Sequence, residues 1–127
     1  MADRPKLLLV EDEPLIRDLL EMVLSEAGFD TVSAAAGQEA IERLRTGAND
    51  FRGMITDVRL SDGHSGWDLA RLARTQLPGI AVVYVTGDGE ADWSSKGAPG
   101  SVLIVKPFAP AQVIAAISSL LSQPPRT

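Results

Sequence analysis

Short apolar segments that alternate with stretches of helical periodicity are the feature that most constrains this chain. The segments with strand character lie at residues 6–10, 31–35, 54–57, 80–85 and 101–105. Several of them are apolar throughout, as in strands that are covered on both faces. Strands that alternate regularly with helices predict an α/β protein, in which a parallel sheet is built through right-handed crossovers.

The intervening segments have apolar residues at helical spacing. The first begins at Pro14, which is tolerated in a first helical turn, and its apolar stripe runs from Leu15 to Ala27 before Gly28 ends it. Further helices are expected over 38–44, 67–77, 90–96 and 109–122. The helix at 90–96 should be short, because a stretch rich in glycine and proline follows it.

Length and composition indicate one globular domain over residues 1–127, with a core at about 5–122 and a tail at 123–127. Hydrophobic residues make up 45% and charged residues 23%, which is a globular balance. The chain has no cysteine and a single histidine, His64. This composition excludes a disulfide framework, a thiolate metal site and a two-histidine zinc motif.

The charge balance and the length of the apolar runs limit which kinds of partner can be expected. A net charge of −5 argues against direct nucleic-acid binding. No apolar run approaches the ~20 residues that would span a bilayer, so membrane insertion is not expected. The N-terminus lacks the apolar region of a secretory signal, and a cytoplasmic location is expected.

Reactive side chains directly follow the expected strands. The acidic run 11–13 follows the first strand, Asp57 ends the third, Thr86 follows the fourth and Lys106 the fifth. Ligands of an open parallel sheet bind beyond the carboxyl ends of its strands, where these groups should converge. Clustered carboxylates repel one another unless a cation joins them, and Mg²⁺ prefers oxygen ligands. With an ammonium and a hydroxyl beside it, such a site can hold a phosphoryl group, and Asp57 would be the nucleophile.

Four sequence pieces, LLLVEDE, ITDVRL, VVYVTGD and VLIVKPF, occur in this order at the ends of the expected strands. Together they resemble the receiver domain of two-component response regulators, of the stand-alone single-domain type. The resemblance implies a flavodoxin-like doubly wound (βα)5 fold with strand order 2-1-3-4-5 and helices on both faces. It also implies a phosphoacceptor signalling module that acts by protein–protein contact on an unknown target, and not an enzyme.

The same resemblance assigns the metal ligands. Glu11 and Asp12 would bind Mg²⁺ together with the carboxylate of Asp57, and Arg59 would offer its backbone carbonyl. Because Arg59 lies two residues beyond Asp57, its side chain should overhang the pocket. We expect it to form an ion pair with Asp88 that restricts attack of water on the acyl phosphate.

The resemblance also assigns the phosphoryl chemistry. Asp57 would accept the phosphoryl group from a histidine kinase or phosphotransfer protein, Thr86 would contact that group, and Lys106 would pair with it. The bond between Lys106 and Pro107 would be cis.

Several positions depart from the family pattern. Leu103 stands where an aromatic switch residue is common, and Ser61 where proline is common. The loop that ends at Gly66 is one residue longer than usual. Two side chains have open roles: His64 is expected in an exposed loop, and Trp93 is a candidate for partner contact.

Three other classes remain as alternatives. A phosphatase with an aspartate nucleophile needs a second acid two residues later, where this chain has Arg59. A nucleotide- or flavin-binding module needs a glycine-rich loop after the first strand, where this chain has EDEP. A degenerate receiver that serves only as a binding module remains open because of Leu103.

Overall fold

The structure, a computed structural model, describes residues 4–46, 50–87 and 90–123. Strands and helices alternate as β1(Lys6–Val10), α1(Pro14–Glu26), β2(Asp30–Ala34), α2(Gly37–Arg45), β3(Phe51–Thr56), α3(Gly66–Gln76), β4(Ala81–Thr86), α4(Glu90–Lys96), β5(Val102–Val105) and α5(Pro110–Leu121). Across these ranges, no helix is long and apolar enough to cross a membrane.

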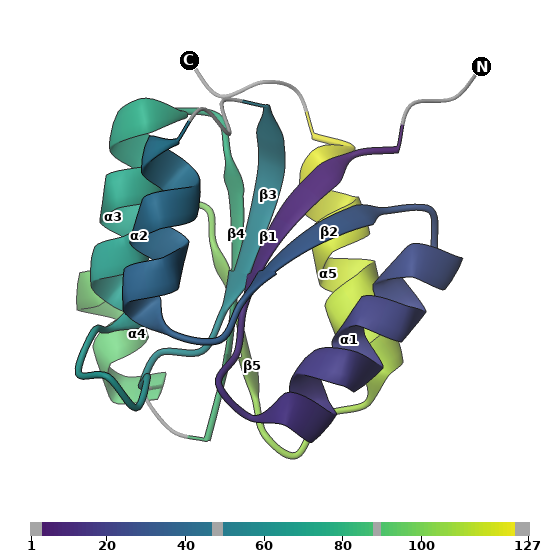
Figure 1. The fold of residues 1–127 in the computed structure, drawn as a ribbon, viewed down its shortest axis with the longest axis horizontal. Coiled ribbons are helices and arrows are strands. Elements are labelled where there is room, and N and C mark those ends of the chain that lie inside the picture. Colours follow the sequence, from purple (N-terminus) through teal and green to yellow (C-terminus); the bar gives the residue numbers. More distant parts are fainter. Residues whose placement is uncertain (1–3, 47–49, 88–89, 124–127) are drawn as a thin grey trace.

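The strands form one parallel sheet in the order β2-β1-β3-β4-β5, as the sequence and the family resemblance predict. Helices α1 and α5 cover one face, and α2, α3 and α4 cover the other (Figure 1). The order reverses between β1 and β3, so the carboxyl ends of these two strands border the crevice where ligands of such sheets bind.

The continuous apolar runs are explained by burial on both faces. In β1, Leu7 and Leu9 pack on the side of α1 and α5, whereas Leu8 and Val10 pack on the side of α2 and α3. All four are buried. A fully buried side chain of this kind contributes roughly 1.5–3 kcal/mol by leaving water, so the central strands anchor both halves of the core.

The element ends differ from expectation mainly in β3. The expected strand at 54–57 in fact begins at Phe51 and ends at Thr56, so Asp57 is the first residue beyond it. Phe51 pairs with Lys6 and is buried. Gly53 continues the strand where a Cβ would lie 2.8 Å from a methyl carbon of Ile117. The strand therefore begins before its apolar run at Met54, because Phe51 and Gly53 both occupy close-packed positions.

Helix α1 buries less of its apolar stripe than the periodicity suggests. Leu20 and Leu24 are buried, but Leu15 is 84% exposed and Leu19 and Met22 also face solvent. The stripe is wider than the surface that the sheet and α5 can cover. The remaining apolar residues form an exposed strip on a helix that begins directly after the acidic run.

Candidate functional site

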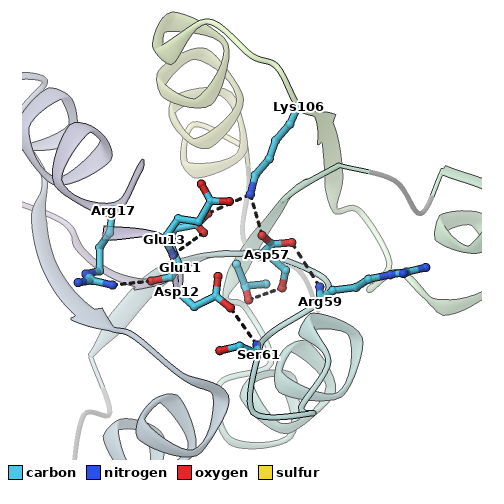
Figure 2. Close-up of polar contacts among 9 residues, drawn as sticks. Glu11, Asp12, Glu13, Arg17, Asp57, Arg59, Ser61 and Lys106 are labelled. Atoms are coloured by element: carbon cyan, nitrogen blue, oxygen red, sulfur yellow. Dashed lines mark hydrogen bonds and ion pairs between the residues drawn. The ribbon is translucent and has the colours of Figure 1, made fainter. Parts of the chain in front are cut away.

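Three carboxylates meet at the carboxyl ends of β1 and β3. Glu11 and Asp12 follow β1, and Asp57 follows β3 (Figure 2). One oxygen from each carboxylate lies within 4.8 Å of the others. The parallel pairing of β1 with β3 brings these residues together although more than forty positions separate them in the chain.

Lys106 approaches this cluster from the end of β5. Its Nζ lies 2.8 Å from Asp57 Oδ2 and 3.5 Å from Glu11 Oε1. Partial burial disfavours the ammonium, but the hydrogen bond to Asp57 and the charges of Asp57 and Glu11 outweigh this effect, so the pKa of Lys106 is raised. The Lys106–Pro107 bond is cis, as the resemblance implies.

Glu11 is the most buried acid of the cluster. Its burial raises the pKa of the carboxyl, although the Glu13 N–H donates a hydrogen bond to Oε2 at 3.1 Å and Lys106 lies close by. Arg17 Nη1 donates to the Glu11 carbonyl at 2.9 Å and holds the backbone there. The sequence analysis does not identify Arg17. The feature that could have pointed to it is a positively charged residue in the first turn of the helix that follows the acidic run.

The backbone around Asp57 fixes its carboxylate. Its N–H donates to the Val10 carbonyl at 3.1 Å, and the Arg59 N–H donates to Oδ1 at 3.3 Å. Gly66 lies against the same backbone, and a Cβ at Gly66 would lie 2.2 Å from the Asp57 carbonyl oxygen. Glycine is therefore required at this position by close approach.

Asp12 is held by the loop between β3 and α3. The Ser61 N–H donates to Asp12 Oδ2 at 2.8 Å (Figure 2). Position 61 was noted in the sequence only because it lacks the common proline. Its backbone donor could not be recognised there, because every residue other than proline offers one.

The remaining predicted residues are placed as follows. Thr86 is buried at the end of β4, and its carbonyl accepts the Lys106 N–H at 2.7 Å. The side chain of Arg59 is exposed, but Asp88 lies outside the described residues, so the expected ion pair between them stays a prediction. His64 was expected to be exposed. It is half-buried instead, because it packs on Gly37, where a Cβ would lie 2.3 Å from the His64 Cβ.

An aromatic side chain stands on β4 rather than on β5. Tyr84 pairs in register with Leu103, is fully buried, and packs on the Trp67 ring at a centroid distance of 4.7 Å. Its hydroxyl accepts the Ala98 N–H at 3.0 Å. Tyr84 therefore connects β4 to the segment that follows α4.

Trp93 on α4 is 38% exposed, and its indole N–H donates to Ser101 Oγ at 3.0 Å. The ring is thus partly covered within the fold, where it also lies against Gly97, and partly exposed to solvent. Its predicted role in partner contact stays a prediction.

The donor set suits a hard divalent cation. All three converging ligands are carboxylate oxygens within 4.8 Å of one another, and their like charges repel. Mg²⁺ accepts oxygen ligands and would relieve that repulsion. The residues present therefore fit the ion that the sequence implies.

A doubly wound sheet with carboxylates and a lysine at its switch point belongs to the class of α/β protein whose ligands bind at the carboxyl edge of the sheet. The family model described as the response regulator receiver domain matches residues 7–118 of the sequence. The chain belongs to this family and is a receiver domain of two-component response regulators.

Solved structures and curated relatives agree with this assignment. The chain is 38% identical to a response regulator receiver protein of Sinorhizobium medicae WSM419, covering 94% of this chain and 95% of that one, with a TM-score of 0.89. It is 28% identical to the response regulator TrrA of Thermotoga maritima, solved in complex with Mg²⁺-BeF, covering 91% and 98% with a TM-score of 0.78.

Among curated proteins, the chain is 35% identical over 118 residues to the transcriptional regulatory protein CusR of Escherichia coli K12. The match covers 91% of this chain and 51% of that protein, so the chain spans about half of this relative's length.

Proposed function

We propose that Asp57 accepts a phosphoryl group from a histidine kinase or phosphotransfer protein. In this proposal Glu11, Asp12, the Asp57 carboxylate and the Arg59 carbonyl hold Mg²⁺. The supporting observation is the convergence of three carboxylates within 4.8 Å, with Lys106 Nζ 2.8 Å from Asp57 Oδ2. A cluster of this charge, with one fixed ammonium, suits the transfer of an anionic group.

The chain's own residues account for most of the chemistry. A carboxylate oxygen of Asp57 attacks the phosphorus of a phosphorylated imidazole, the P–N bond breaks, and the departing nitrogen takes up a proton. Lys106 neutralises charge on the new acyl phosphate, and the Thr86 hydroxyl donates to it. The bound cation would supply further neutralisation of the phosphoryl oxygens.

The same proposal includes how the signal leaves the site. Phosphorylation adds charge beside Thr86 and favours one of two arrangements of the segment that follows β4, which a protein target then recognises. We further propose that residues 1–127 form a single receiver domain that acts in the cytoplasm, without a separate catalysed reaction.

The docking site of the donor protein is proposed on α1. Asp57 is only 7% exposed, so a protein donor must cover the rim of the pocket to reach it. Helix α1 begins at that rim and exposes Leu15, Leu19 and Met22 at a spacing that places them on one face. Leu15→Ser should slow transfer from a phosphorylated donor protein and leave labelling by a small acyl phosphate unchanged.

The proposal is tested by labelling with a small acyl phosphate, with and without Mg²⁺, and reading the intact mass. The wild type should gain one phosphoryl group only with Mg²⁺, and Asp57→Asn should gain none. Asp68→Asn, which changes an exposed acid on α3, is the matched control and should label like the wild type. Labelling that persists in Asp57→Asn, or no labelling of the wild type, contradicts the proposal.

The alternatives are less well supported. Arg59 still occupies the position where a phosphatase of this type needs an acid. A degenerate receiver would not need to keep the lysine and all three carboxylates together, as they lie here.

A further inference from the structure

The long loop between β3 and α3 folds into a small structured unit. Arg59 and Ser65 form an antiparallel bridge, and the Gly63 N–H donates to the Leu60 carbonyl at 3.1 Å. Gly63 adopts a φ of +89°, which favours glycine at this turn. Leu60 is buried in the core. This loop, residues 59–66, is therefore shaped by its own contacts as well as by its ends.

The loop is docked on the N-terminus of α2. Asp62 Oδ2 accepts the Gln38 N–H at 2.9 Å, across 24 residues of chain. Next to it, His64 packs on Gly37, which leaves no room for a Cβ. The residue before α2 is Ala36, which has no side-chain acceptor, so Asp62 takes the place of the missing cap.

The same hydrogen bonds affect the pKa of Asp62. Hydrogen bonds from backbone N–H groups, that of Gln38 first among them, hold the pKa of the Asp62 carboxyl below its usual range. The carboxylate is exposed and ionised, and it faces the positive end of the helix dipole.

The opposite side of the loop contacts the acidic cluster. Ser61, adjacent to Asp62, donates its N–H to Asp12 Oδ2 at 2.8 Å. Arg59, whose carbonyl is a proposed metal ligand, begins the same loop. The residue that caps α2 and the residue that donates to Asp12 are therefore neighbours in one loop.

We propose that Asp62 is a positioning residue for the cation site: by capping α2, it holds the loop so that the Ser61 N–H orients Asp12. This inference rests on the proposed Mg²⁺ site and deepens it, because it makes the affinity for the cation depend on a contact with α2. Groups that orient a metal ligand typically contribute about 10–100-fold to affinity. Asp62 acts one contact further away, so a loss of about three- to tenfold is expected.

The test is Mg²⁺ titration by calorimetry on the wild type, Asp62→Ala and Asp62→Asn. Asp62→Ala should weaken binding by about three- to tenfold, and Asp62→Asn, which keeps an acceptor for the cap, should stay within about twofold of wild type. Glu39→Ala is the matched control. At the same helix end, Glu39 Oε1 accepts the Ala35 N–H at 2.8 Å, and the variant removes this contact without touching the loop. It should bind Mg²⁺ like the wild type.

A second measurement reads the loop directly. The amide proton resonance of Ser61 should move upfield in Asp62→Ala, as its hydrogen bond to Asp12 weakens, and stay in place in Glu39→Ala. Wild-type affinity together with an unmoved Ser61 resonance in folded Asp62→Ala overturns the inference. A wild type that binds no Mg²⁺ overturns the proposed cation site itself, so the two failures are distinguishable.

Discussion

The acidic edge of the sheet and the segment around α4 lie near each other but are held in different ways. The acidic edge is the set Glu11, Asp12, Asp57 and Lys106, in which buried and half-buried charges are fixed by three strand ends and a docked loop. The α4 segment, residues 90–101, contains a short helix with an exposed side. The Tyr84 hydroxyl ties it to β4 by accepting the Ala98 N–H, whereas the hydrogen bond from Trp93 to Ser101 closes within the segment.

The difference indicates which part can respond to a change at the site. The acidic edge accepts unfavourable like-charge contacts because a rigid sheet holds them. The α4 segment can move by breaking a few hydrogen bonds, which costs about 1 kcal/mol each. A phosphoryl group at Asp57 would therefore alter α4 more easily than it would alter the sheet.

The largest effect should come from Gly66→Ala, which breaks the acidic edge. The new Cβ would lie 2.2 Å from the Asp57 carbonyl oxygen, so the backbone of Asp57 must shift. We expect a loss of about 3 kcal/mol in the free energy of unfolding, measured with urea, and weaker Mg²⁺ binding. Gly79→Ala is the control, since nothing lies within 4 Å of its Cβ. A Gly66→Ala protein as stable as Gly79→Ala would contradict the close approach.

Tyr84→Phe should loosen the α4 segment and leave the acidic edge intact. It removes the acceptor of the Ala98 N–H, and an unpaired, partly buried donor costs about 1.5 kcal/mol. Urea unfolding measures the loss, and faster hydrogen exchange at Ala98 locates it. Mg²⁺ affinity should be unchanged. A loss of Mg²⁺ affinity that accompanies the loss of stability would show that the two regions are not separable.

Glu11→Gln should stabilise the metal-free protein while removing a proposed cation ligand. Burial raises the pKa of Glu11 above its ordinary value of 4.5, so the folded state holds the proton more tightly than the unfolded chain. The contribution of Glu11 to the stability of the metal-free wild type therefore falls as the pH rises from 4.5 through the folded pKa, and it stays unfavourable above that pKa.

At neutral pH with a chelator, the gain of Glu11→Gln over wild type should be on the order of 1 kcal/mol in urea unfolding. The variant should also lack the wild-type loss of stability across that pH window. A destabilised variant at neutral pH would mean that the contacts of Glu11 with Lys106 and Glu13 outweigh its burial.

Ser101→Ala should have the smallest effect, about 0.5 kcal/mol in urea unfolding, because Trp93 is partly exposed and water can replace the lost acceptor. Its clearer sign is a red shift in tryptophan emission. The matched comparison introduces Ser101→Ala into Trp93→Phe, where only buried Trp67 emits and no shift should appear. A shift that persists there would assign the signal to the core instead of α4.

Much of this architecture was predictable from local pattern. The run from Leu7 to Val10 has the unbroken apolarity of a strand covered on both faces, and the sheet confirms it. The order of the acidic run, Asp57 and Lys106 along the chain predicted a shared edge, and these side chains do meet there. Helix 90–96 was predicted with the observed bounds, because glycine and proline end it.

Other features could not be predicted, because they depend on partners far away in the chain. The outer half of the α1 stripe looks like a core face until the width of the sheet and α5 is known. His64 was expected in solvent, and its contact with Gly37 exists only because the loop folds back on α2.

The sequence alone thus determined the alternation of strands and helices and which residue types follow the strand ends, since periodicity and residue type are local properties that the backbone expresses directly. Tertiary structure decided that Asp62 caps α2, that Ser61 orients Asp12 and that Tyr84 holds Ala98. Each of these contacts joins a backbone N–H to a side chain from another element. Every residue but proline has such a donor, so only the packed fold selects which one is used.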